Sequence, residues 1–113
     1  MRLAAVAGLA LSLGAAPPTS VNDTAIIAST YPAALAEYRF FADASAQTPA
    51  VRVTPYRLNT PLWSDGAEKR RFMYLPAGAK ANAHGEGLLD LPAGAALIKT
   101  FAFGTRWAAR FRR

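Results

Sequence analysis

The only histidine of this 113-residue chain, His84, has the side chain best suited to bind a metal or to transfer a proton. It lies in the polar segment 81–87, where Glu86 is the only other metal-ligating residue nearby. A metal site needs several ligands, so we interpret His84 as an exposed loop residue. Ser64 and Asp65 would complete a hydrolase set with His84, but no nucleophile-elbow motif surrounds Ser64. The pair Asp65-Gly66 instead predicts a turn.

A compact basic run, Lys69-Arg70-Arg71, lies among aromatic residues on which the bases of a single-stranded nucleic acid could stack. In a strand, however, successive side chains point to opposite faces, so the run does not form one basic patch. Acidic residues also lie beside it, at Asp65 and Glu68. We therefore expect no nucleic-acid partner. An enzyme is the least favoured class, because nothing resembles a paired general acid and base.

The formal charge of +6 is concentrated at the two ends of the chain. Setting aside Arg2 and the four arginines among the last eight residues leaves eight basic residues against seven acidic ones. The body is thus nearly neutral, and the basic tail is interpreted as a solvated end. The chain has no cysteine, which excludes disulfides, zinc-thiolate sites and covalent haem attachment within it.

Residues 1–20 have the order typical of a secretory signal peptide. Arg2 supplies a positive start, residues 3–13 are uncharged and mostly apolar, and small residues follow at 14–16. The apolar run is shorter than the roughly 20 residues that span a bilayer. We therefore expect cleavage, a periplasmic or extracellular mature protein, and no transmembrane anchor.

Residues 17–29 are rich in proline and small polar residues, and residues 21–30 are predicted to be a linker. The following residues, 32–41, begin with proline, which suits the first position of a helix. Their apolar side chains Ala34, Leu35, Tyr38 and Phe41 recur at helical spacing. The pattern predicts one short helix that packs over a sheet.

From residue 50 onward the apolar period changes towards two. Val51 and Val53 alternate with a polar residue, and Pro55 and Pro61 then confine this stretch to an edge strand or an extended loop. Residues 70–75 are strand-like, with Phe72 and Tyr74 on one side.

Residues 97–103 form the best strand pattern, with Ile98 and Thr100 on one face and Leu97, Lys99 and Phe101 on the other. The string Leu-Pro-Ala-Gly-Ala occurs at both 75–79 and 91–95, and each copy predicts a turn. The fold class is therefore mainly β with one short N-terminal helix. About 80 residues with open sheet edges indicate a partial antiparallel sheet or sandwich, an incomplete domain.

Four blocks of sequence are more specific than any single residue. They are Tyr-Pro-Ala-Ala-Leu-Ala-Glu-Tyr-Arg-Phe-Phe at 31–41, Pro-Tyr-Arg-Leu-Asn-Thr-Pro-Leu-Trp-Ser-Asp at 55–65, Arg-Phe-Met-Tyr-Leu-Pro-Ala-Gly at 71–78, and Leu-Ile-Lys-Thr-Phe at 97–101. In this order they resemble the N-terminal region of a family of bacterial exported diheme c-type cytochrome-like proteins of unknown role. The resemblance covers residues 31–103, which we define as a β-rich N-terminal module.

The chain departs from this family in ways that bear on function. Family members are several times longer and carry Cys-x-x-Cys-His haem attachments further along, whereas this chain has no such motif. No family redox residue can be transferred to it, and haem c is expected only in full-length relatives. Residues 104–113 leave the family pattern and have the composition of a shifted reading frame in GC-rich DNA. Our hypothesis is a truncated or frameshifted member.

Two classes of function follow. The first is the N-terminal module of an electron-transfer protein without its haem half, whose partner is an envelope redox protein or the missing cytochrome half. The second is a free-standing exported binding module for a glycan or an envelope protein. The candidate binding surface consists of polar and aromatic residues from the blocks above: Tyr56, Asn59, Trp63, Asp65, Arg71 and Tyr74.

Overall fold

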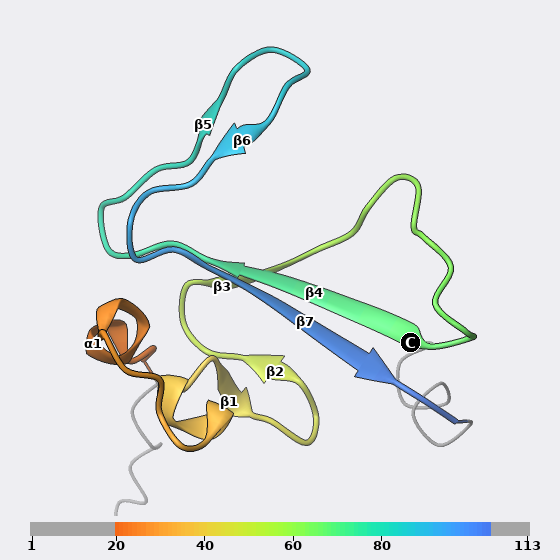
Figure 1. Ribbon diagram of the computed structural model, residues 1–113, viewed down its shortest axis with the longest axis horizontal. Coiled ribbons are helices and arrows are strands. Elements are labelled where there is room, and N and C mark those ends of the chain that lie inside the picture. The colour runs from red at the N-terminus through yellow and green to blue at the C-terminus, as the bar shows by residue number, and fades with distance from the viewer. Residues whose placement is uncertain (1–19, 105–113) are drawn as a thin grey trace, which may run out of the picture.

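The computed structural model describes residues 20–104, which form a mainly β structure with one short α-helix, as the sequence predicted (Figure 1). The predicted signal peptide, apart from Ser20, and the basic tail, apart from Gly104, lie outside these residues. The elements, in chain order, are α1 (Asp23–Ile27), the 3-10 turn η1 (Leu35–Tyr38), β1 (Phe41–Asp43), β2 (Thr48–Pro49), β3 (Val53–Tyr56), β4 (Glu68–Tyr74), β5 (Asn82–Ala83), β6 (Leu89–Asp90) and β7 (Ala96–Ala102).

The strands form three antiparallel sheets: the pairs β1-β2 and β5-β6, and the three-stranded sheet β3-β4-β7. In the last sheet β3 is an edge strand, which confirms the prediction from its proline. Pro55 lies opposite Phe72 in the register and has no N–H to donate to a second neighbour. Pro55 is thus compatible with the edge position of this strand and unfavourable to a central one.

One face of the β3-β4-β7 sheet, which we call the inner face, covers a small core. Phe72 and Tyr74 share one side of β4, as predicted, and the structure buries both there together with Val53 of β3. Phe41 packs edge-on against Phe72, with ring centroids 5.0 Å apart. Phe40 and Ile26 also contact this cluster, so the N-terminal elements cover this face. In Figure 1, α1 lies where β4 ends and β7 begins, and the β1-β2 pair lies below the sheet.

The helix predicted at 32–41 is wrong in extent. Only η1 is helical there, and Phe41 already begins β1. The turn ends because Arg39 adopts a left-handed backbone, with φ of 56°. Leu35 is 84% exposed, so the apolar spacing does not mark a buried helical face. The burial falls instead on Phe40 and Phe41, which pack against the core.

The structure's one α-helix within the described residues lies in the segment 21–30 that we predicted to be a linker. Asn22 is the N-cap of α1, and its side-chain oxygen accepts a hydrogen bond from the Ala25 N–H at 3.3 Å. The Asn22 side-chain amide also donates to the carbonyl of Glu37 at 3.1 Å. Val21 is buried in the core. Polar residues typical of a linker are here capping residues, because both roles use side chains that bond to the local backbone.

The left-handed backbone at Arg39 gives a prediction about stability. An L-residue pays a steric cost there that glycine does not, and the exposed Arg39 side chain lies outside the core. Arg39→Gly should therefore stabilise the fold by about 1 kcal/mol, as measured by urea denaturation. The matched change Arg57→Gly, at an exposed residue whose own φ is not positive, should not stabilise; equal effects of the two would contradict the assigned conformation.

The two Leu-Pro-Ala-Gly-Ala strings form turns, as predicted. In each, the last alanine N–H donates to the proline carbonyl at 3.1 Å, and the glycine has positive φ, 73° at Gly78 and 82° at Gly94. The turns bend the chain out of β4 and back into β7, and the β5-β6 pair projects beyond them (Figure 1). They also meet each other, since a Cβ at Gly94 would lie 3.1 Å from the Pro76 ring.

This contact distinguishes the two glycines experimentally. Alanine at either position must adopt a strained φ, but only at Gly94 would it also press on Pro76. We expect Gly78→Ala to cost about 1 kcal/mol and Gly94→Ala about 1 kcal/mol more. Thermal unfolding of the two variants side by side measures the difference. A smaller loss for Gly94→Ala would show that the turns do not touch.

Candidate functional site

The face of the β3-β4-β7 sheet opposite the core, which we call the outer face, gathers cationic and apolar side chains. Antiparallel register places Met73 opposite Leu97, Arg71 opposite Lys99, and Lys69 opposite Phe101. On the other neighbouring strand of β4, Tyr56 of β3 lies opposite Arg71 and shares its face. The outer face thus has an apolar row, a cationic row and a mixed row. Its residues are Tyr56, Lys69, Arg71, Met73, Leu97, Lys99 and Phe101.

The three cations of the outer face lie close together without carboxylate partners among residues 20–104. Asp90, for example, is paired with His84. Partial loss of solvent around the ammonium, followed by the charges of Lys99 and Arg71, lowers the pKa of Lys69. The Lys99 ammonium lies 4.6 Å from the Phe101 ring centroid. The outer face is therefore electropositive and favourable to an anion.

The loop 57–67 adds exposed aromatic and apolar groups beside these cations. Its Ser64–Ala67 turn is closed by a 2.8 Å hydrogen bond from the Ala67 N–H to the Ser64 carbonyl. Asp65 and Gly66 both have positive φ, as a tight turn of the I′ type requires, which confirms the predicted turn. The Lys69 ammonium donates to the Leu62 carbonyl and ties the loop to β4. Trp63 is left 82% exposed.

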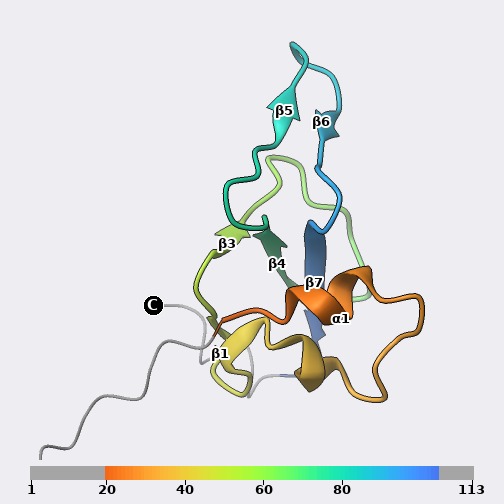
Figure 2. The same ribbon diagram turned by 90° about the vertical axis from the view of Figure 1, so that its left-hand side faces the viewer.

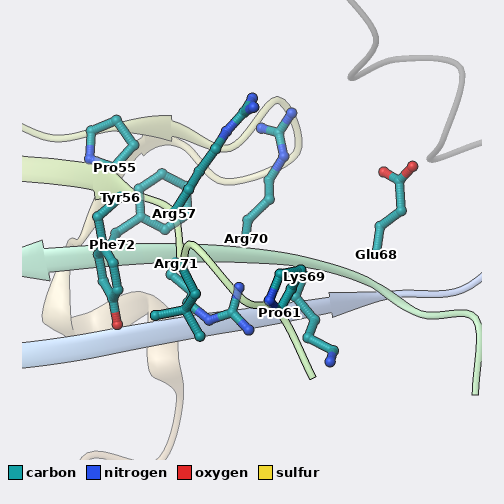
Figure 3. A pocket seen from close by; sticks show the side chains of 10 residues that line it. Pro55, Tyr56, Arg57, Pro61, Glu68, Lys69, Arg70, Arg71 and Phe72 are labelled. Atoms are coloured by element: carbon teal, nitrogen blue, oxygen red, sulfur yellow. The ribbon is translucent and has the colours of Figure 1, made fainter. Parts of the chain in front are cut away.

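A cationic groove of about 720 Å³ lies between this loop and the sheet (Figure 3). Figure 3 shows Lys69 and Arg71 pointing to one side of β4 and Arg57 and Arg70 to the other. Loss of solvent lowers the pKa of Arg70, with Glu68 opposing this change and Arg57 adding to it. The opposite directions of these side chains in Figure 3 confirm that the run Lys69-Arg70-Arg71 does not form a single patch.

The structure brings together part of the predicted binding surface. Tyr56 and Arg71 are neighbours in the register, and Trp63 lines a second hollow of about 310 Å³ together with Lys69 and Arg71. Asn59 and Asp65 are exposed in the loop. The prediction missed the other members of the outer face, which are Lys69, Met73, Leu97, Lys99 and Phe101. Alternation shows which residues of one strand share a face. Only the pairing of β4 with β7 shows that these residues of the two strands lie on the same face of the sheet.

Tyr74 does not belong to this surface. It is 3% exposed on the inner face, and its hydroxyl donates to an Asp23 carboxylate oxygen at 2.5 Å. Burial first, and then the hydrogen bond and charge of Asp23, raise the pKa of the Tyr74 phenol. Tyr74 therefore attaches α1 to the sheet and is unavailable to a ligand.

The residues considered for catalysis do not assemble. His84 lies in the exposed loop that joins β5 to β6, and its Nε2 is 2.9 Å from an Asp90 oxygen, so its partner is not Ser64. Within residues 20–104, no three His, Cys, Asp or Glu side chains gather as metal ligands would. No helix in the same range is long and apolar enough to cross a membrane.

Figure 2, turned by a quarter from Figure 1, shows the β5-β6 pair extending away from the layers formed by α1, β1 and the β3-β4-β7 sheet. His84, in the loop between β5 and β6, thus lies outside the sheet that forms the cationic outer face. The arrangement can bind an anionic surface, and it offers the outer face and the loop 57–67 for that purpose. Comparisons of the chain with family models, with curated proteins and with solved structures find no match.

Proposed function

We propose that this chain is the exported N-terminal module of a c-type cytochrome-like electron-transfer protein, without its haem-binding part, and that it works by docking. The supporting observation is where the cytochrome-like sequence blocks lie. The block 55–65 supplies the second half of β3 and the loop after it, 71–78 supplies the C-terminal part of β4, and 97–101 supplies the centre of β7. Those blocks therefore build one sheet and its outer face.

In this proposal the module binds and the haem, held elsewhere, transfers electrons. Its partner is an envelope redox protein or the missing cytochrome half, and export to the periplasm or outside the cell rests on the signal-peptide pattern at 1–20. Electron transfer needs close approach of the partners more than tight binding, which suits a charged docking face.

Sequencing the gene with its downstream DNA in all three forward frames tests the cytochrome relationship. Codons for Cys-x-x-Cys-His motifs downstream in another frame would support it, and would make residues 104–113 the product of a shifted frame. An uninterrupted stop codon with no such codons downstream would contradict the relationship and leave a free-standing module.

A free-standing binding module for a glycan or an envelope protein is the second candidate, and Trp63 is the observation that favours it. An indole that is 82% exposed on a loop fixed by a tight turn is placed to stack on a sugar ring.

The change Trp63→Ala tests this candidate. Because the indole is exposed, we expect unfolding free energy to change by less than about 0.5 kcal/mol while retention on immobilised polysaccharide is lost. Affinity electrophoresis measures the retention. Tyr31→Ala, which removes an aromatic that is 92% exposed and distant in sequence from the loop, is the matched control. Wild-type protein that passes through unretarded would rule out the polysaccharides tested.

A further inference from the structure

We infer that the outer face docks transiently onto an acidic protein surface, one in which carboxylates surround an apolar patch. The inference rests on the docking role proposed above, but not on the haem relationship. It is carried by the side chains that strand pairing brings together on the outer face, three of them cationic and three apolar.

Charge complementarity identifies the partner as acidic. Arg71 and Lys99 lie directly opposite each other on neighbouring strands, a placement in which like charges repel, and Lys69 follows on the same face. None of the seven carboxylates forms an ion pair with these cations within residues 20–104. Glu68 points to the same side of β4 as Arg70, away from the outer face (Figure 3), and Asp65 and Glu86 are exposed in loops. The other four bond elsewhere. Asp23 accepts from Tyr74, Asp90 pairs with His84, Glu37 accepts from the Ala34 N–H, and Asp43 accepts from Ser45.

The apolar members of the outer face indicate a protein, since polysaccharides and nucleic acids are bound largely by stacking on rings. Leu97 is 61% exposed and has no ring on which a sugar or base could stack. It lies opposite Met73 and forms an aliphatic row beside the cations. Aromatic residues, methionine and arginine are the types enriched in protein interfaces.

The same composition favours a separate protein that binds transiently. It disfavours another domain that covers the outer face permanently. Permanent interfaces resemble a protein core, and three adjacent cations would each lose their hydration on such burial. In a short-lived complex these cations stay partly hydrated, speed association and fix orientation. We therefore assign the outer face to an encounter with an acidic envelope protein.

The experiment measures binding of fluorescent poly(Glu,Tyr), a copolymer with carboxylates and apolar rings, to the full chain. We expect it to bind more tightly than poly-glutamate, and its affinity to fall as salt rises. Lys99→Glu should weaken binding by about tenfold, which corresponds to the loss of a close charge contact. Lys80→Glu outside the outer face and Arg112→Glu in the basic tail make the same change in net charge and should change affinity less than twofold.

Leu97→Ser supplies the apolar test, because it leaves the charge intact and should bring binding of the copolymer down to that of poly-glutamate. Thermal unfolding of each variant shows that the fold persists. Equal losses for Lys99→Glu and Arg112→Glu would overturn the inference, because binding would then follow net charge alone. Stronger binding of heparin, single-stranded DNA or phosphatidylglycerol vesicles than of the copolymer would also overturn it. None of these outcomes depends on haem, whereas the gene sequence decides that relationship separately.

Discussion

Replacing Phe72 by alanine should cost about 3–5 kcal/mol of folding free energy, the largest effect we expect of any single substitution. Its ring is 3% exposed and packs edge-on against Phe41 at the centre of a core of only five buried apolar residues among those described. A small domain has little stability to lose, so this change should leave much of the chain unfolded at 25 °C. Urea denaturation followed by circular dichroism measures it.

Phe101→Ala is the matched control for this change. Phe101 is on the outer face of the same sheet and is 46% exposed, so its loss should cost less than about 1 kcal/mol. Each variant removes one phenyl ring: Phe72→Ala removes it from the inner face, in β4, and Phe101→Ala removes it from the outer face, in the neighbouring strand β7. If Phe101→Ala cost as much as Phe72→Ala, the outer face would be buried in solution, and its assignment as a free docking surface would be wrong.

Tyr74→Phe should destabilise the chain by about 1–2 kcal/mol at neutral pH. It removes the hydroxyl that donates to Asp23 at 2.5 Å, a contact between the sheet and α1. Hydrogen bonds to charged groups contribute more than neutral ones, and the exposure of Asp23 reduces that contribution here. The phenyl ring keeps the core filled, so only the polar contact is tested. Chemical denaturation of wild type and variant gives the difference.

The difference between wild type and Tyr74→Phe should also depend on pH. The folded-state pKa of Tyr74 is raised above its ordinary value of about 10. Its stabilising contribution is therefore complete below pH 10 and is lost as pH rises through the folded-state pKa. Denaturation at pH 8, 10 and 11 should show the two proteins converging. A constant difference across this range would contradict the raised pKa.

The strands could be predicted from the sequence because their signals are local. Alternation in 70–75 and 97–103 fixed which side chains share a face, and Pro55 marked an edge strand. The positive φ values of Gly78 and Gly94 agree with the turns expected from their strings. Each of these features depends on residues within a few positions of one another.

The helix and the composition of the site could not be predicted in the same way, because both depend on distant contacts. The five residues of α1 are stabilised by capping at Asn22 and by the bond from Tyr74, which lies 51 positions away in sequence. Strand pairing likewise decides that Arg71 meets Lys99. Tyr74 was assigned to the binding surface from its aromatic type, but its position in β4 directs it inward.

Mapping the bound copolymer on the chain by amide chemical shifts tests most directly whether the outer face is the docking surface. Titration of the ¹⁵N-labelled chain with poly(Glu,Tyr) should shift the amides of β4 and β7 around Lys69, Arg71, Leu97 and Lys99, together with the loop 57–67. The amides of η1 and the β5-β6 pair should stay in place. Shifts confined to residues 105–113, or to α1 and β5-β6, would contradict the account.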